Sequence, residues 1–396
     1  MSGVVIFGPP FGLGPVSRAV RTATLLAADG HDVTLATFAD GVDHAMRSVA
    51  DGNVPRGPGR VQVTDVGGRD PRRWPTGVPA SPDVAISVMD ERVLAGWHRQ
   101  DHAPARLIFI DSLHWHRAPP VEHLRDTDVV LAQHFPGAGQ AEASLRRRGI
   151  NVCVHAPIAG SPHGAVDPAA SMSTAPGPLL LYLGGLSSPP CRPTDYRPFV
   201  QAVCRAVTDV GRAVDLPVVL TGPACGDVGS SAQGPPLEQL GTSRFVHELT
   251  RSALVIAPPG IETTNEAILA GTPIVHLPPV NATQIEAASR FNDAGIPAVA
   301  PSWTTVAPQL RHSDSKARTL ALQARLNDEH VQLGDDIRTQ LTTIARRLSD
   351  PGEQQRVAAT QRRLLPSGLP RFEDCLRDAL AGAREHQCRR QRQSAS

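Results

Sequence analysis

The chain has 396 residues, which is too long for one ordinary hydrophobic core, so we expect two domains. Its formal net charge of +1 and its aromatic content of 4% argue against a nucleic-acid-binding protein. No apolar run approaches the ~20 residues of a membrane span, and no basic segment precedes an apolar one at the N-terminus, so we expect a cytoplasmic protein without a signal peptide.

The first part of the chain alternates short apolar runs with longer helical patterns. This alternation predicts βα units and a mainly parallel sheet. The predicted strands are Val4–Phe7, Val33–Phe38, Val61–Val66, Val84–Met89, Leu107–Ile110, Val129–Leu131 and Val152–His155.

A segment rich in Pro, Ser, Ala and Gly then predicts an interdomain linker over residues 161–178. The predicted domains are therefore residues 1–160 and 179–370, with a C-terminal helix and a disordered tail over residues 371–396. Strands expected in the second domain are Leu179–Leu183, Pro217–Leu220, Phe245–Val246, Ala253–Ala257, Ile274–Leu277 and Ala298–Ala300.

The six cysteines are scattered, and no two have the spacing of a zinc or redox motif. Reduced thiols are the simplest interpretation.

The first predicted strand runs into a glycine-containing loop at residues 8–14, and a helix follows with Val16, Val20, Ala23 and Ala27 on one face. The glycines allow a ligand to approach the backbone closely. Such a loop alone is common in α/β proteins.

The most informative segment is residues 258–295. Gly260 permits a tight turn, Thr263 and Thr264 open a helix that carries Glu266, and Gly271 ends it. The unpaired N–H groups of such a helix start attract anions. This pattern favours a phosphate site with a carboxylate one turn further on, within reach of a sugar hydroxyl.

Together the two segments resemble those of nucleotide-sugar glycosyltransferases of the GT-B fold, family 1 and the related family 28. The loop Gly12-Leu13-Gly14-Pro15 resembles their GxGH loop. Residues 260–273 resemble their GGxGTTxEAxxxGxP signature through Gly260, Thr263, Thr264, Glu266, Ala267, Gly271 and Pro273. The resemblance implies an α/β protein with two Rossmann-like domains, whose mainly parallel sheets face a central cleft.

By this resemblance, Gly260, Thr263 and Thr264 would hold the donor diphosphate and Glu266 the ribose hydroxyls. Gly14, Gly184 and Gly185 would line the donor site, Phe245 and Val246 would face the base, and Gln284 would contact the donor sugar. The expected partners are a UDP- or dTDP-linked sugar and a small-molecule acceptor, with neither metal nor other cofactor.

Three positions depart from the family pattern. Pro15 stands where the catalytic histidine is usual, Pro258 where family 1 has a phosphate-contacting histidine, and Thr283 where an acid usually binds the donor sugar. The missing base needs a substitute, and Asp111, acting directly or through His114 or His116, is the predicted one. His134 is a further candidate, and an amine acceptor, which needs less deprotonation, is the alternative. The blander interpretation of Asp111 is a structural turn residue.

A metal site at His114 and His116 is an alternative interpretation, although loop histidines are commoner. The predicted function is inverting, metal-independent glycosyl transfer, and the arginine-rich composition suggests natural-product biosynthesis in an actinobacterium. The first alternative is a catalytically inactive GT-B pseudo-transferase that binds a nucleotide or activates a partner. The second is a nucleotide-sugar epimerase.

Overall fold

The computed structural model describes residues 3–10, 14–50, 58–67, 78–79, 82–99, 104, 106–116, 123–125, 128–158, 177–186, 188, 190–222, 235–300 and 315–381. The chain divides into two compact units: residues 1–158 with 365–396, and residues 159–364. The first boundary lies close to the predicted one, and most of the predicted linker lies outside the described residues. The C-terminal segment, predicted as a separate region, belongs to the first unit.

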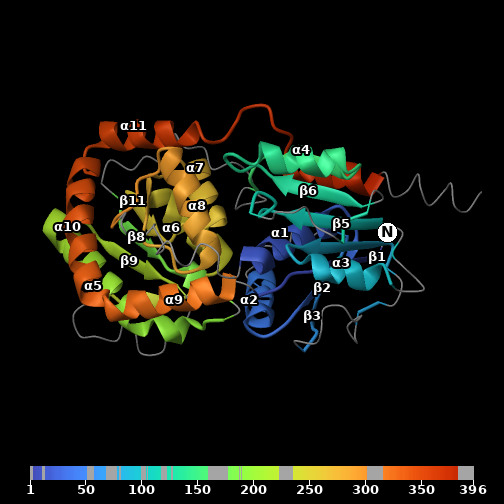
Figure 1. Ribbon diagram of the computed structural model, residues 1–396, viewed down its shortest axis with the longest axis horizontal. Coiled ribbons are helices and arrows are strands. Elements are labelled where there is room, and N and C mark those ends of the chain that lie inside the picture. Colours follow the sequence, from blue (N-terminus) through green and yellow to red (C-terminus); the bar gives the residue numbers. More distant parts are fainter. Residues whose placement is uncertain are drawn as a thin grey trace, which may run out of the picture. The chain divides into compact units, whose positions relative to one another are not determined.

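The first unit contains a seven-stranded parallel sheet in the order β3-β2-β1-β4-β5-β6-β7 (Figure 1). Its strands are β1 (Gly3–Phe7), β2 (Asp32–Thr37), β3 (Val61–Asp65), β4 (Val84–Val88), β5 (Arg106–Asp111), β6 (Val129–Gln133) and β7 (Asn151–His155). All seven lie at the runs predicted from the sequence, because apolar, β-branched residues recur there between helical patterns.

Helices cover both faces of this sheet. They are α1 (Gly14–Ala28), α2 (Asp40–Ser48), α3 (Glu91–Trp97), α4 (Gly139–Arg147) and a C-terminal helix over residues 372–381. Val4 and Ile6 share a core with α1 and with Phe372 of the C-terminal helix, whereas Val5 and Phe7 pack with α3 and α4 on the opposite face. A sheet buried on both faces needs apolar residues at nearly every strand position, as this sequence has.

The second unit contains a five-stranded parallel sheet in the order β10-β9-β8-β11-β12. Its strands are β8 (Leu179–Tyr182), β9 (Val218–Thr221), β10 (Leu237–Glu238), β11 (Leu254–Ala257) and β12 (Ile274–His276). The helices of this unit are η2 (Gly184–Leu186), η3 (Pro193–Tyr196), α5 (Arg197–Val214), α6 (Thr242–Arg251), α7 (Ile261–Ala270), α8 (Ala282–Asp293), α9 (Ser315–Asp328), α10 (His330–Leu348) and α11 (Pro351–Arg362).

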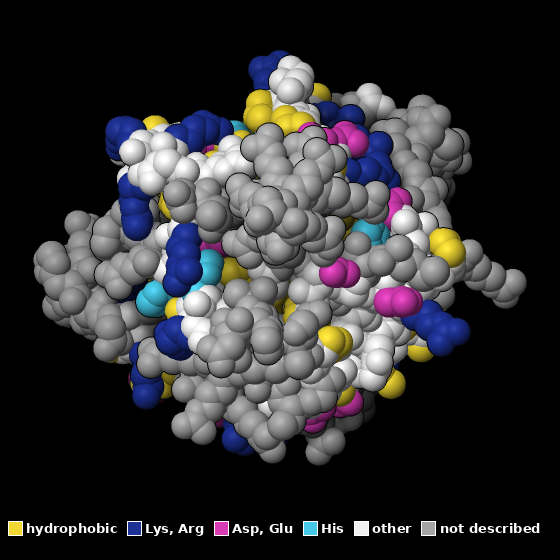
Figure 2. Space-filling model, turned by 90° about the vertical axis from the view of Figure 1, so that its right-hand side faces the viewer, with side chains coloured by type: hydrophobic (Ala, Val, Ile, Leu, Met, Phe, Trp, Pro, Cys, Tyr) yellow, Lys and Arg dark blue, Asp and Glu magenta, His cyan; other side chains and the backbone are white. Residues whose placement is uncertain are grey.

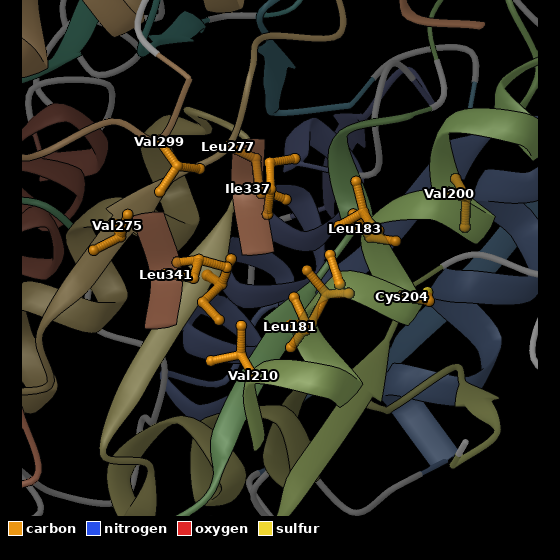
Figure 3. Packing of buried hydrophobic residues seen from close by; sticks show 14 of the residues in the cluster. Leu181, Leu183, Val200, Cys204, Val210, Val275, Leu277, Val299, Ile337 and Leu341 are labelled. Atoms are coloured by element: carbon orange, nitrogen blue, oxygen red, sulfur yellow. The ribbon is translucent and has the colours of Figure 1, made fainter. Parts of the chain in front are cut away.

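One hydrophobic core joins the strands of the second unit to its helices (Figure 3). Leu181 and Leu183 from β8 and its end meet Ile337 and Leu341 of α10 in this core, and all four side chains are fully buried. Burying a leucine or isoleucine side chain stabilises a fold by about 1.5–3 kcal/mol. This core therefore fixes the positions of the strand ends from which the loops of the second unit start.

Two predicted strands of the second unit are wrong. Phe245 and Val246 lie inside helix α6, and near Ala298 the chain makes only an isolated bridge to His276. A pair of adjacent apolar residues fits one turn of an amphipathic helix as well as a short strand, and here the helix pattern of residues 242–251 prevails.

The cysteines also differ from expectation, because Cys153 on β7 and Cys375 in the C-terminal helix form a disulfide. The two residues are 222 positions apart, a separation that no motif spacing signals. Among the described cysteines, Cys191 and Cys204 are buried and are not part of a disulfide.

None of the helices in the described part of the chain is long and apolar enough to cross a membrane. On the face drawn in Figure 2, basic and acidic side chains both occur among the described residues. This mixture agrees with the nearly neutral net charge.

The disulfide should stabilise the first unit. We expect Cys375→Ser and Cys153→Ser each to lower the free energy of unfolding of that unit by about 2–5 kcal/mol, because a cross-link over a long loop restricts the unfolded chain. Denaturant unfolding of oxidised protein measures the change, and peptide mapping without reductant identifies the bond. The double variant should lose no more than the larger single loss, and additive losses would show that the two thiols act separately.

Candidate functional site

The sheet of the second unit reverses its strand order between β8 and β11. From β8 the chain proceeds to β9 and β10 on one side, and from β11 it proceeds to β12 on the other. The loops that follow β8 and β11 therefore leave in opposite directions at neighbouring strand ends. Ligands of open α/β sheets bind at the carboxyl ends of strands beside such a switch point.

Helix α7 starts directly after β11 at this switch point. Gly260 is its N-cap in an extended conformation, and no side chain caps the helix. The first helical hydrogen bond runs from the Thr264 N–H to the Gly260 carbonyl at 3.0 Å. The first N–H groups of a helix have no acceptor within the helix, which makes a helix start favourable for an anion.

Thr264 is fully buried and anchors this helix start to the neighbouring strand. Its hydroxyl donates to the Gly260 carbonyl at 2.6 Å and lies 2.9 Å from Nε2 of His276 at the end of β12. A hydroxyl has one proton to donate, and in this structure Thr264 donates it to the Gly260 carbonyl. The diphosphate contact predicted for Thr263 and Thr264 stays a prediction.

Gly185, in the loop after β8, lies against the side chain of Gln284 on α8. A Cβ atom on Gly185 would overlap Nε2 of Gln284, so a larger residue there would displace this amide. The Gln284 Oε1 accepts a hydrogen bond from the Val280 N–H at 2.9 Å, which fixes the amide. The helix behind it, α8, is capped by Asn281, whose side chain accepts from the Gln284 N–H at 3.0 Å.

Phe245 reaches the same strand end through an aromatic contact. Its ring lies 4.6 Å from that of Tyr182, the last residue of β8, and Tyr182 also packs against Gly184. Val246 is half-buried beside it. Glu266 lies on α7 and is 8% exposed. The donor-site residues predicted in the second domain thus come from the loops or helices that follow β8, β11 and β12, with α6 behind them.

The first unit has its own switch point, between β1 and β4. Gly14 and Pro15 begin helix α1 after β1, where proline is favourable because the first helical N–H needs no acceptor. A proline side chain cannot accept a proton, so Pro15 cannot act as the general base.

The three predicted base residues lie at the end of β5 and in the turn that follows it. Asp111 is 1% exposed, and its carboxylate accepts the Leu113 N–H at 2.7 Å, as in a structural turn. His114 is also buried, with Nε2 at 3.5 Å from the Glu142 carboxylate of α4, and this polar contact lowers the pKa of Glu142. His116 is half-buried, with its ring 5.7 Å from that of Trp115. A base has to reach its proton at about 2.6–3.2 Å, which favours His116 among these three.

Two polar pairs of the first unit could not be predicted from the sequence. One joins His114 to Glu142, and the other joins Ser17 of α1 to His44 of α2. Partners separated by 27 or 28 residues on different elements leave no local pattern in a sequence. Among the described residues, no group of three or more His, Cys, Asp or Glu side chains could hold a metal ion.

Buried histidines should make stability depend on pH. Burial lowers the pKa of His276 and of His155 to about 3, so both stay neutral in the folded chain where the unfolded chain binds protons. The free energy of unfolding should therefore fall as pH drops below about 6.5, by up to about 1.4 kcal/mol per pH unit for each histidine.

Denaturant unfolding between pH 7 and pH 4 measures this slope. His276→Gln should make it shallower by about one proton, and His155→Gln should do the same in the other unit. If neither variant alters the pH dependence of the free energy of unfolding, these two histidines do not cause it.

Comparisons with known proteins agree with the fold. No known protein family matches the sequence, and no curated protein matches it. Among solved structures, UGT73P12 of Glycyrrhiza uralensis with glycyrrhetinic acid 3-O-monoglucuronide matches 100% of this chain and 98% of its own, at 12% identity and a TM-score of 0.54. The glycosyltransferase VinC with dTDP matches 97% of this chain and 100% of its own at 14% identity, with a TM-score of 0.49. The match to UGT73P12 shows that the chain has the GT-B fold predicted from its sequence.

Proposed function

We propose that the protein is a glycosyltransferase that passes a sugar from a nucleoside-diphosphate sugar, linked to UDP or dTDP, to a small-molecule acceptor. The observation that carries the proposal is the uncapped start of α7 beside the switch point, with Gly184, Gly185 and Gln284 at the neighbouring strand end. The shared fold adds support, since the UGT73P12 structure is a complex with glycyrrhetinic acid 3-O-monoglucuronide.

The proposed site suits the charge of a nucleoside diphosphate. A helix N-terminus carries the equivalent of about half a positive charge, and its first N–H groups donate hydrogen bonds to phosphate oxygens. Because the departing diphosphate gains negative charge as the glycosidic bond breaks, the same groups stabilise the transition state more than the ground state. Glu266 would accept hydrogen bonds from the ribose, and Gln284 would contact the sugar.

The proposed chemistry is a single displacement. The acceptor hydroxyl loses its proton to a base as its oxygen forms a bond to the anomeric carbon. The bond from that carbon to the diphosphate oxygen breaks, and the diphosphate leaves with the electron pair. Attack from the side opposite the leaving group inverts the anomeric centre. Donor binding by helix N–H groups and hydroxyls needs no metal. A natural-product acceptor and a cytoplasmic location stay predictions from composition.

Pro15 favours a second candidate function, a nucleotide-binding protein without transferase activity. The two candidates share donor binding and differ in turnover. Calorimetry with UDP and dTDP, combined with a panel of nucleotide sugars and phenolic, alcohol and amine acceptors, separates them. Binding without turnover on any acceptor would favour the second candidate.

The substitution Gly260→Asp tests the diphosphate site without unfolding the protein. A Cβ atom at Gly260 meets nothing closer than the Pro258 carbonyl at 3.8 Å, so the side chain fits. An aspartate N-cap bonds to the free N–H groups and stabilises a helix by about 0.5–2 kcal/mol. It also places a negative charge where the diphosphate should bind. We expect UDP affinity to fall at least about tenfold while the melting temperature holds or rises.

Gly260→Ala is the matched control, because it adds a Cβ atom and neither caps the helix nor carries a charge. It should retain UDP affinity within about threefold, since alanine leaves the N–H groups free. If Gly260→Asp binds UDP as tightly as the native chain, the diphosphate does not occupy the α7 helix start.

A further inference from the structure

A serine and a histidine form a hydrogen-bonded pair close to the position of the missing base. The Ser17 Oγ lies 2.8 Å from Nε2 of His44, and both residues are half-buried. Ser17 lies in the first turn of α1, two residues after Pro15. The pair is therefore at the β1 side of the switch point in the first unit, and solvent reaches part of it.

The fold builds this pair through close backbone contacts. The Thr37 hydroxyl at the end of β2 donates to the Gly8 carbonyl at the end of β1, at 2.7 Å. Gly41, in the first turn of α2, faces Pro10 and Val16, which a Cβ atom would meet at 3.1 and 3.2 Å. Because glycine lets α2 approach the start of α1 so closely, His44 lies against Ser17, the residue after Val16.

The surroundings of His44 keep it uncharged. Burial, and after it the positive charges of Arg47 on α2 and Arg21 on α1, lower its pKa to about 4. At neutral pH its ring therefore has one nitrogen with a free electron pair. When that nitrogen is Nε2, the Ser17 hydroxyl donates to it and the serine oxygen can in turn accept a proton from a third group.

We propose that Ser17 and His44 form a proton relay that replaces the histidine absent at position 15, an inference that rests on the proposed transferase function. The acceptor hydroxyl gives its proton to Ser17 Oγ, and the Ser17 proton passes to His44 Nε2. The acceptor oxygen bonds to the anomeric carbon while the bond from that carbon to the diphosphate breaks, and the diphosphate leaves with the electron pair.

The relay differs from two of the other candidate bases in its accessibility, and from all of them in its position next to Pro15. Asp111 and His114 are buried at 1% and 3% exposure, and the Asp111 carboxylate already accepts the Leu113 N–H. Ser17 combines partial exposure with a partner of the correct kind: a neutral imidazole at hydrogen-bond distance. It touches the acceptor in this proposal, and His44 acts through it.

The first experiment examines the pair without turnover. Nitrogen NMR of histidine-labelled protein, with the His44 signal assigned from its loss in His44→Gln, should show His44 neutral between pH 8 and pH 5, with the proton on Nδ1. Ser17→Ala should shift the Nε2 signal, and Ser17→Thr, which keeps the hydroxyl, should shift it far less. Two results would refute a hydrogen-bonded pair with a neutral His44. One is titration of His44 near pH 6.5, and the other is an Nε2 signal that Ser17→Ala does not shift.

The second experiment measures transfer from UDP-glucose and dTDP-glucose to the acceptor panel. His44→Gln and Ser17→Ala should each lower kcat by about 10²–10⁴-fold, the usual contribution of a positioned base. UDP affinity and melting temperature should stay unchanged. The double variant should be no worse than the worse single variant, because both residues act in one step.

Two controls separate the possible failures. His330→Gln, at the start of α10 in the other unit, should leave kcat unchanged, and Ser17→Thr should retain most of it. Transfer by the native chain together with full kcat in His44→Gln overturns the relay and leaves the transferase intact. Absence of transfer by the native chain on the whole panel overturns the proposed function and the relay with it.

Discussion

The strand order of the two sheets is the constraint on which the rest of the structure depends. In a parallel sheet, every connection between strands crosses one face of the sheet. Successive strands are added at one edge of the sheet until the order reverses. Where the order reverses, neighbouring loops leave in opposite directions and expose backbone groups that regular pairing would cover. Both units reverse once, between β1 and β4 and between β8 and β11. Each unit therefore presents one helix start, that of α1 or of α7, beside its switch point.

The two helix starts have different chemistry because their first residues differ. At α7 the N-cap is a glycine, which has no side chain to cap the helix, and the Thr264 hydroxyl is hydrogen-bonded to His276 of β12. The first N–H groups of such a helix suit an anion. At α1 a proline occupies the first turn, and the next polar side chain, Ser17, points to a neutral histidine. One start suits negative charge, and the other suits the handling of a proton.

The sequence predicted the periodic features of the molecule well. Seven apolar runs became the seven strands of the first sheet, and the glycine, threonine and proline pattern of residues 260–273 became a turn, a helix and a C-terminal stop with Gly271 in the left-handed conformation. These features depend on neighbours along the chain. Phe245 and Val246 were misassigned because two adjacent apolar residues carry too short a pattern to separate strand from helix.

Features formed by distant residues escaped prediction. The pairs Ser17–His44 and His114–Glu142, like the Cys153–Cys375 disulfide, join residues that only the folded chain brings together. Burial was equally invisible. Thr264 and His114 belong to residue types that are usually solvated, and the structure encloses both. The donor-site residues could be proposed from the motif alone, whereas the use of each side chain depended on its surroundings.

The return of the C-terminal helix to the first unit has a consequence for how the protein is made. Phe372 and Leu376 complete a core whose other members, such as Val4 and Ile6, belong to the first strand. During synthesis, one face of the first sheet keeps apolar surface exposed until the helix over residues 372–381 has left the ribosome. The second unit, encoded between the two parts of the first, can bury its own core earlier. The first unit is thus synthesised first, but its core is completed after that of the second unit. Until then its exposed apolar surface can aggregate or bind chaperones.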